Sequence, residues 1–259
     1  MDDATTGFVK TRWLFGSFRS RLRAWGSQVR LTGVASCARR QRGAKRASLW
    51  VWRFGSLLLT LLASCSSRAI GQESECYAKL KAADVRFERV PATKAAGVEW
   101  PIKLTGPVDG VKIYGGRKNA PTNYLDCRLA LALVEWAPLL KRQGVEGLQH
   151  YSMYRHESTV GSSTKSSGHS LGRAIDVAFF DLGDGTRLSV LDDWKNRRRG
   201  AAPCELRSSD DAEKLMRDLV CEASEHRIFH MILTPHYNDA HKNHLHLEVG
   251  DPRTDAWVD

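Results

Sequence analysis

The sequence predicts an α+β domain with a mainly antiparallel central sheet flanked by helices. Two long segments, 124–143 and 210–226, carry apolar residues at helical spacing, whereas three shorter apolar stretches have the length of strands. These stretches are 173–180, 229–233 and 243–249. Helices and strands do not alternate regularly along the chain, as a doubly wound parallel sheet would require. The order therefore favours an antiparallel sheet.

The segment 124–143 is the first predicted helix. Its apolar residues recur at intervals of three or four, namely Leu125, Leu129, Leu133, Trp136 and Leu140. Asn123 precedes it as a candidate N-cap, and Gly144 follows as a stop signal. Pro138 is expected to kink the helix or to end it early, because proline lacks the N–H that an interior helical position donates.

The segment 210–226 is the second predicted helix, with Ser208 or Ser209 placed to cap its first turn. Its apolar stripe consists of Ala212, Leu215, Leu219 and Ala223. We expect the stripes of both helices to face the core of one domain, since the chain after residue 75 has no internal repeat and no low-complexity linker.

The formal net charge of +10 is concentrated at the N-terminus. Residues 1–48 contain eleven Lys or Arg and two Asp, so the other 211 residues carry only about +1. Attraction to a nucleic acid requires basic side chains that share a folded surface, so the nearly neutral remainder argues against nucleic-acid binding. We expect residues 1–48, which lack apolar periodicity, to be disordered or not translated. A basic tail that binds nucleic acid or anionic lipid is the alternative.

An apolar run over residues 54–63 follows Arg53. It has about half the ~20 residues that a membrane-spanning helix needs, and a positive flank before a short apolar stretch is typical of a secretory signal peptide. The run ends in Leu-Ala-Ser-Cys, which resembles a bacterial lipobox. We therefore expect a lipoprotein signal peptide over residues 49–64, with translation starting near its beginning and lipidation of Cys65; an ordinary signal with a chance cysteine is the alternative.

Lipidation would anchor the protein to a membrane without spanning it, because each buried CH₂ of an acyl chain contributes about 0.8 kcal/mol. Ser66 follows the cysteine in place of an inner-membrane retention aspartate and resembles a signal for outer-membrane sorting. The expected location is therefore the periplasmic face of the outer membrane. Residues 65–74 are expected to form a tether, and residues 75–259 the domain.

Four cysteines lie in the expected domain, namely Cys76, Cys127, Cys204 and Cys221. An even number in an oxidising compartment predicts two disulfides. Three pairings are open, of which Cys76 with Cys127 and Cys204 with Cys221 joins nearest neighbours. A four-thiolate zinc site is the rival, although the spacings lack the close Cys-x-x-Cys pairs of such sites.

Asp176 lies inside the predicted strand 173–180, among apolar neighbours. An ionised carboxylate in that setting is costly unless a cation holds it. A metal ion is one such partner, and His169, seven positions earlier, could supply a second ligand. A capping or salt-bridged aspartate is the alternative.

Two histidines, His244 and His246, alternate with aliphatic residues near the end of the chain, followed by Glu248. On a strand these three side chains share one face, while the aliphatic residues pack into the core. The two imidazoles would lie about 7 Å apart, so one can bind a metal while the other reaches its water. This arrangement suits hydrolysis; two surface histidines on an edge strand are the alternative.

The ten residues from Ser167 to Asp176 match every fixed position of the signature Ser-x-His-x-x-Gly-x-Ala-x-Asp. The chain thereby resembles the D-Ala-D-Ala carboxypeptidase and murein endopeptidase superfamily, known as LAS enzymes. In that superfamily the His and Asp of the signature bind zinc together with a C-terminal histidine. The resemblance implies a LAS-type fold and one Zn²⁺ held by His169, Asp176 and His246.

Within that superfamily, residues 76–248 are similar to the bacterial extensin-like C-terminal domain family. The shared features are Cys127-Arg128 near the first helix, Trp194-Lys195 after the aspartate strand, and a closing His-x-x-His-x-His.

The closing motif differs from that of the LAS carboxypeptidases, which carry Glu-x-x-His with glutamate as general base. Asn243 stands at the glutamate position, and the segment resembles the ending of penicillin-insensitive murein endopeptidases. The resemblance implies His244 as the general base. His241 is then expected to orient the substrate or to support the site, with a structural role as the alternative.

Tyr154-Arg155 resembles the Tyr-Arg that precedes the signature in these enzymes, although Tyr154 replaces the usual glycine or cysteine before the arginine. The resemblance implies that Arg155 stabilises the developing oxyanion. Tyr154 and Ser167 are expected to contact the substrate or to support the ligands.

The resemblance to LAS enzymes implies a zinc metallopeptidase that hydrolyses amide bonds in peptidoglycan peptides, and we expect it to be a monomer. Its expected partners are peptidoglycan and, through the lipid anchor, a membrane, but no nucleic acid. The alternative is a non-catalytic cell-wall-binding or structural lipoprotein that retains the zinc site. The sequence leaves open which bond is cut, whether D,D or L,D type, and whether by an endopeptidase or a carboxypeptidase.

Overall fold

The computed structural model describes residues 71–115, 120–250 and 257–258, all within the unit Val51–Asp259. The predicted disordered segment, signal peptide and lipidation site Cys65 lie outside the described residues, as does most of the predicted tether. No described helix has the length and apolarity needed to cross a lipid bilayer.

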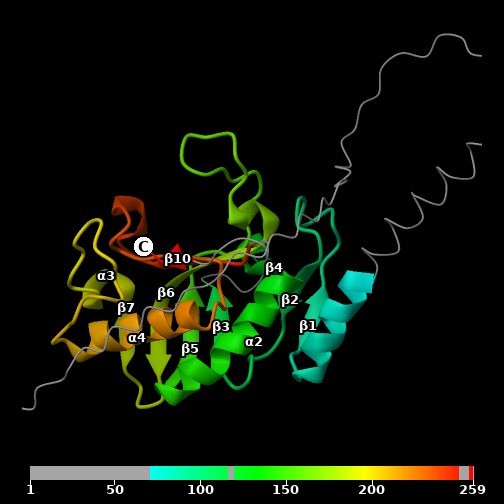
Figure 1. Ribbon diagram of the computed structural model, residues 1–259. Helices are drawn as coiled ribbons and strands as arrows, with labels where there is room; N and C mark the ends of the chain where they lie inside the picture. Colours follow the sequence, from blue (N-terminus) through cyan, green and yellow to red (C-terminus); the bar gives the residue numbers. More distant parts are fainter. Residues whose placement is uncertain (1–70, 116–119, 251–256, 259) are drawn as a thin grey trace, which may run out of the picture. The chain divides into compact units, whose positions relative to one another are not determined.

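Two sheets and their helices form an α+β fold (Figure 1). The larger sheet has the strand order β10-β8-β9-β6-β5-β3, with β7 paired to β6. Its strands are β3 (Lys112–Gly115), β5 (Val145–His150), β6 (Ala174–Leu182), β7 (Arg187–Ser189), β8 (Met231–Leu233), β9 (Leu245–Glu248) and β10 (Trp257–Val258). The smaller sheet has the order β1-β2-β4. Its strands are β1 (Phe87–Arg89), β2 (Pro101–Leu104) and β4 (Tyr124–Asp126).

Most of the strand pairs are antiparallel, and two are parallel, namely β3 with β5 and β10 with β8. The predicted fold class is therefore confirmed, with a mixed rather than a purely antiparallel larger sheet. The strands β6 and β9 lie side by side near the middle of this sheet, and both carry residues of the candidate site.

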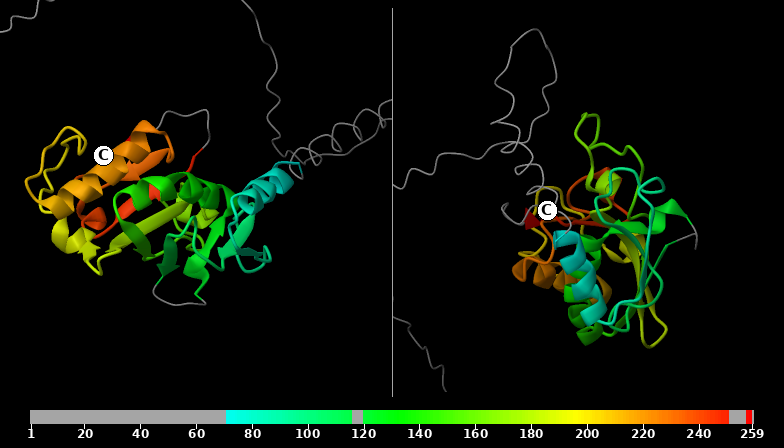
Figure 2. Two further views of the ribbon diagram at one scale, coloured as in Figure 1. Left: turned by 90° about the horizontal axis from the view of Figure 1, so that it is seen from below. Right: turned by 90° about the vertical axis from the view of Figure 1, so that its right-hand side faces the viewer.

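Two long helices, α2 (Cys127–Arg142) and α4 (Asp211–Glu225), pack against one face of the larger sheet (Figure 2). Trp136 of α2 packs edge-on against Phe180 of β6 and against Phe229, and all three side chains are fully buried. Burial of side chains of this size stabilises the fold by about 1.5–3 kcal/mol each. Further helical segments cover residues 71–82 and α3 (Val190–Asp193), and short 3-10 turns form η1 (Pro121–Asn123), η2 (Gly168–Leu171) and η3 (Asp239–His241).

The first long helix begins later than predicted. Asp126, not Asn123, is its N-cap, because the Asp126 side chain accepts a hydrogen bond from the Arg128 N–H at 3.0 Å. The residues between them form β4, which completes the smaller sheet. The expectation that Pro138 ends the helix early is wrong, since α2 continues to Arg142.

The second long helix is capped by Asp210, whose side chain accepts from the Glu213 N–H at 2.9 Å. The predicted cap Ser208 instead accepts from the Asp210 N–H at 3.1 Å, so it supports the capping residue.

Both predicted disulfides are present, in the nearest-neighbour pairing. Cys76–Cys127 joins the helix over residues 71–82 to the start of α2. Cys204–Cys221 joins the segment before α4 to that helix.

Candidate metal centre

Three neighbouring elements bring His169, Asp176 and His246 together. Asp176 lies on β6 and His246 on β9, and the two residues are direct partners in the antiparallel register. Because directly opposed residues point to the same face of a sheet, their side chains meet. His169 comes from η2, which immediately precedes β6.

The turn that carries His169 has a local explanation in the signature residues. The Ser167 hydroxyl accepts a hydrogen bond from the His169 N–H at 3.3 Å and so caps η2. Gly172 ends the turn in the left-handed region, with φ 63°. A side chain there would meet the Asp126 backbone nitrogen at 2.9 Å, and this nitrogen donates to the Gly172 carbonyl oxygen. Only glycine fits both requirements.

One nitrogen of each histidine and one carboxylate oxygen form a nearly equilateral triangle. His169 Nε2 lies 2.9 Å from Asp176 Oδ1 and 3.1 Å from His246 Nδ1, and the latter lies 3.0 Å from the same oxygen. All three residues are buried.

The remaining ring nitrogens fix how the two histidines are oriented. His169 Nδ1 donates to the Met153 carbonyl oxygen at 3.2 Å, and His246 Nε2 donates to Glu248 Oε2 at 3.2 Å. With these protons assigned from their acceptors, the lone pairs of both rings point at Asp176 Oδ1. Partners of this kind commonly orient metal-bound histidines.

Three acceptors at such short range need a cation between them. Burial raises the pKa of Asp176, but hydrogen bonds with His169 and His246 outweigh burial and hold it below its usual range. Burial lowers the pKa of His246, whereas Asp176 and Glu248 together raise it to about 9. In the metal-free protein a proton on His246 therefore supplies the positive charge between the three acceptors. Burial lowers the pKa of His169.

A zinc ion fits the same triangle. The ligand atoms of a tetrahedral zinc site with bonds of about 2.0–2.1 Å lie roughly 3.3 Å apart, close to the separations found here. Two imidazoles and one carboxylate are also a common ligand set for catalytic zinc. His244 lies outside the set of mutually close ligand atoms, whose members lie within 4.8 Å of one another. The centre therefore offers three protein ligands and an adjacent, separate histidine.

His244 lies beside this centre, immediately before β9 rather than on it. Its Nε2 is 3.4 Å from Asp176 Oδ1, and its Nδ1 is 2.9 Å from Asn243 Oδ1. Because the Asn243 oxygen can only accept, it holds the proton on Nδ1 and leaves the Nε2 lone pair facing the centre. Burial lowers the pKa of His244 and keeps the ring in its neutral form.

His241 stands next to His244, with their ring centres 5.1 Å apart. Its Nδ1 lies 2.7 Å from Asn238 Oδ1, and burial lowers its pKa to about 4. Two exposed tyrosines flank the pair: the Tyr151 ring lies 6.0 Å from that of His244, and the Tyr237 ring 5.4 Å from that of His241.

The structure separates the roles expected for Tyr154 and Arg155. The Arg155 guanidinium lies 3.6 Å from Asp176 Oδ2 and remains half exposed, so it borders the centre. Tyr154 is not brought to the centre. It is buried in a small separate apolar cluster, and its hydroxyl donates to the Ala96 carbonyl oxygen at 3.0 Å.

Several residues of the centre did not stand out in the sequence. Ser152 donates from its hydroxyl to Asp176 Oδ2 at 3.1 Å, and Met153 provides the carbonyl that orients His169. Tyr151 and Tyr237 line the histidine pair. Only proximity to Arg155 in the sequence could have singled out Ser152 and Met153, and the Met153 carbonyl, as a backbone acceptor, has no sequence signature. Glu248 was placed on the same face as His246, and its hydrogen bond now explains its position.

The family model described as extensin-like protein C-terminus matches residues 74–256. The chain has no match among curated proteins or among solved structures. Because the family match covers more than half of the chain, the protein belongs to the extensin-like protein C-terminus family.

Proposed function

We propose that this protein is a zinc-dependent hydrolase of amide bonds in peptidoglycan peptides. The observation that carries the proposal is the convergence of His169 Nε2, Asp176 Oδ1 and His246 Nδ1 within 2.9–3.1 Å of one another. A fourth group, His244 Nε2, is poised beside them with its lone pair free to take a proton.

His169, Asp176 and His246 would hold the zinc ion, with Met153 and Glu248 fixing the two rings. Zinc, when bound, supplies Lewis-acid polarisation of a carbonyl group and of water.

His244 provides the proton transfer that hydrolysis needs. Its neutral Nε2 accepts the proton of the attacking water as the oxygen bonds to the amide carbon. The same nitrogen then returns this proton to the leaving amine as the carbon–nitrogen bond breaks. Asn243 keeps Nδ1 protonated throughout, so Nε2 is the atom that exchanges the proton.

Arg155 stabilises the charge that develops on the carbonyl oxygen. Its guanidinium is half exposed and lies at the rim of the centre, 3.6 Å from Asp176 Oδ2. A fixed cation at the position where negative charge appears lowers the barrier more than it stabilises the substrate.

The substrate class rests on the resemblance of the signature over residues 167–176 to LAS enzymes, whose superfamily we propose for this chain. Tyr151 and Tyr237, exposed by 45% and 42%, offer amphipathic walls beside the histidines for a peptide with small side chains. Attachment to the periplasmic face of the outer membrane through Cys65, as part of the same proposal, rests on the sequence alone.

Digestion of purified sacculi with the zinc-loaded full chain tests the proposal. We expect soluble muropeptides in the digest and none with His244→Ala, while zinc content stays unchanged. His226→Ala, which changes an exposed histidine at the end of α4, is the matched control and should digest normally. A wild-type protein that binds zinc and sacculi but releases nothing would favour the non-catalytic wall-binding alternative.

A further inference from the structure

A cluster of charged side chains lies where β4 of the smaller sheet meets η2, the turn that carries His169. Asp126 ends β4, and its side chain is fully buried. Arg128, in the first turn of α2, donates from Nε to Asp126 Oδ1 at 2.7 Å and from Nη2 to Asp126 Oδ2 at 2.8 Å. The two side chains therefore form a paired contact, which fixes both the distance and the orientation of the carboxylate.

The buried carboxylate depends on Arg128 for its countercharge. Among the residues that the structure describes, only Arg128 forms an ion pair with Asp126. A buried carboxylate is costly without a cation, so Arg128 decides how Asp126 is held. The Arg128 guanidinium also lies 4.1 Å from the centre of the Trp100 ring, and the Trp100 N–H donates to Asp126 Oδ2 at 3.2 Å. Trp100 therefore restricts both members of the pair.

The backbone of Asp126 connects this ion pair to the turn that carries His169. β4 is an edge strand of the smaller sheet, and its Asp126 N–H donates to the Gly172 carbonyl oxygen at 2.8 Å. The Gly172 N–H in turn donates to the His169 carbonyl oxygen at 3.2 Å. The path from Arg128 to His169 thus consists of one side-chain ion pair and two backbone hydrogen bonds.

A second connection runs through Glu99 and Arg173. Glu99 Oε2 accepts from Arg128 Nη2 at 2.8 Å and from Arg173 Nη2 at 3.1 Å. The Arg173 N–H donates to the Gly168 carbonyl oxygen at 2.8 Å, and the Arg173 carbonyl oxygen accepts from the Val249 N–H at 2.9 Å. Because the Glu99 side chain is 47% exposed, water screens its ion pairs, and we expect this connection to contribute less than the buried pair.

The three candidate ligands differ in what holds them in place. Asp176 and His246 are direct partners in the register of β6 and β9, so the sheet itself sets their separation. His169 comes from a short 3-10 turn outside the sheet. Its position relative to the other two ligands therefore depends most on the contacts that hold η2.

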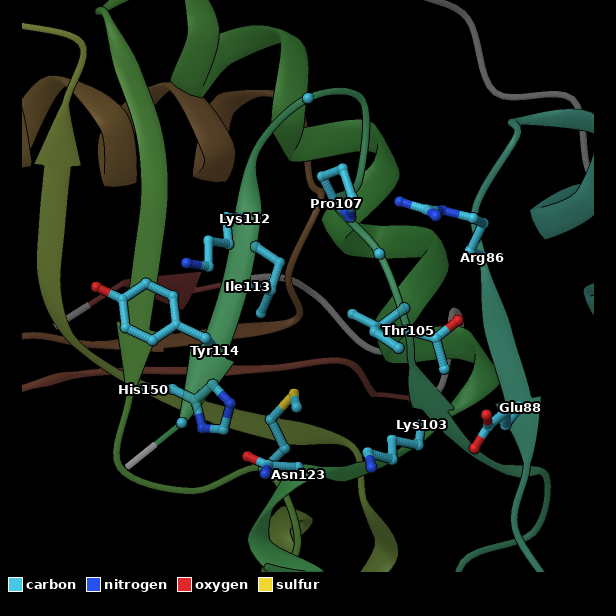
Figure 3. Close-up of a pocket in the computed structure, with 15 residues that line it drawn as sticks. Arg86, Glu88, Lys103, Thr105, Pro107, Lys112, Ile113, Tyr114, Asn123 and His150 are labelled. Carbon is cyan, nitrogen blue, oxygen red and sulfur yellow. The ribbon is translucent and has the colours of Figure 1, made fainter. Parts of the chain in front are cut away.

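The network is separate from the cavity between β2 and β3 (Figure 3). Asn123, which precedes β4, lies with His150 at one end of that cavity, whereas Asp126 ends the strand. Neither Asp126 nor Arg128 lines the cavity. A change at Arg128 would therefore act on the metal centre through η2 and not through the cavity wall.

We propose that Arg128 is a positioning residue for the metal centre. By holding Asp126 it fixes η2, and with η2 the His169 ring, at the distance from Asp176 and His246 that zinc requires. Arg128 itself contacts Asp126, Glu99 and Trp100 rather than a ligand. The proposal rests on zinc binding, which is part of the proposed function, but not on peptide hydrolysis.

Zinc affinity and the visible absorption of the cobalt-loaded full chain test the proposal. Arg128→Met removes the charge and the paired donors but keeps an apolar chain against Trp100. We expect its zinc affinity to fall about tenfold, as for the loss of other groups that orient ligands, and the cobalt absorption, which depends on ligand geometry, to change with it. Arg128→Lys keeps the charge without the paired geometry and should fall between the two.

Arg217→Met is the matched control, because it removes an arginine from another buried ion pair, with Glu213 in α4. The hydrogen-bond partners of Arg217 lie on α4, at residues 196 and 203 and at residue 236, away from η2 and β6. This variant should therefore lose stability and keep its zinc affinity, measured for every variant well below the onset of unfolding.

The outcomes separate this proposal from the proposed function. A wild type that binds zinc, with the same affinity and cobalt absorption in both Arg128 variants, would overturn the positioning role alone. A loss of zinc affinity in Arg217→Met as large as in Arg128→Met would assign the effect to general stability and would also overturn it. A wild type that binds neither zinc nor cobalt would overturn the metal centre as well. If Arg128→Met does not fold, the comparison of Arg128→Lys with the wild type decides.

Discussion

Substitution of Glu248 by glutamine should weaken metal binding without touching a metal ligand. Glu248 Oε2 accepts a hydrogen bond from His246 Nε2 at 3.2 Å, which leaves Nδ1, the other ring nitrogen, free for the metal. Loss of such a partner commonly costs 10–100-fold in metal affinity, or about 1.4–2.7 kcal/mol. Because the Glu248 side chain is 21% exposed, water screens part of its charge, and we expect the lower part of this range, about 10–30-fold.

The assay is a competition between the full chain and a zinc chelator of known affinity. Glu146→Gln is the matched control, because it makes the same change on an exposed side chain of β5 and should leave the affinity unaltered. Gly168→Ala should reproduce the defect by a different route, since its Cβ would lie 2.3 Å from the Glu248 carboxyl group and displace it. Equal zinc affinity in wild type and Glu248→Gln would refute the claim that this carboxylate fixes the His246 ring.

Three further predictions concern stability and catalysis. Burial lowers the pKa of His150 to about 4, so below about pH 6.5 the unfolded chain binds more protons than the folded chain. The unfolding free energy should therefore fall by up to about 3 kcal/mol from pH 6.5 to 4. In denaturant titrations His150→Gln should show a flatter dependence of this free energy on pH, and an unchanged dependence would contradict a buried, neutral His150. The double variant Cys204→Ser with Cys221→Ser opens a loop with a sequence separation of 17 and should lose about 3 kcal/mol in the same assay, whereas wild-type stability would rule out a structural role. In Asn243→Ala no acceptor holds the proton on His244 Nδ1, so the ring can also carry its proton on Nε2. This variant should lower kcat on muropeptides by at least about tenfold, with KM and zinc content nearly constant. An unchanged kcat would show that Asn243 has no part in the mechanism.

The sequence predicts the two strands that carry Asp176 and His246, but not their pairing. His246 alternates with aliphatic residues, whereas Asp176 has apolar neighbours on both sides. The structure confirms the two strands and puts these residues opposite each other. The spacing between His244 and His246 also predicted that one of them stands apart from the other, and His244 lies outside the group of close candidate ligand atoms.

The predicted start of the first helix and its early end at Pro138 failed for reasons that local sequence does not contain. The segment between Asn123 and Asp126 has the composition of a helix start, but pairing with β2 makes it a strand. Pro138 is tolerated inside α2 because the residues on both sides are buried against the core, which outweighs one missing hydrogen bond.

The different positions of Tyr154 and Arg155, which are adjacent in sequence, depend on the backbone direction after Met153.

Zinc content of the purified full chain, measured by elemental analysis, tests the central claim most directly. We expect one zinc per chain, its loss in Asp176→Ala and His246→Ala, and its retention in His244→Ala. No zinc in the wild type after loading, or loss of zinc in His244→Ala as complete as in His246→Ala, would contradict a three-ligand centre with a separate proton acceptor.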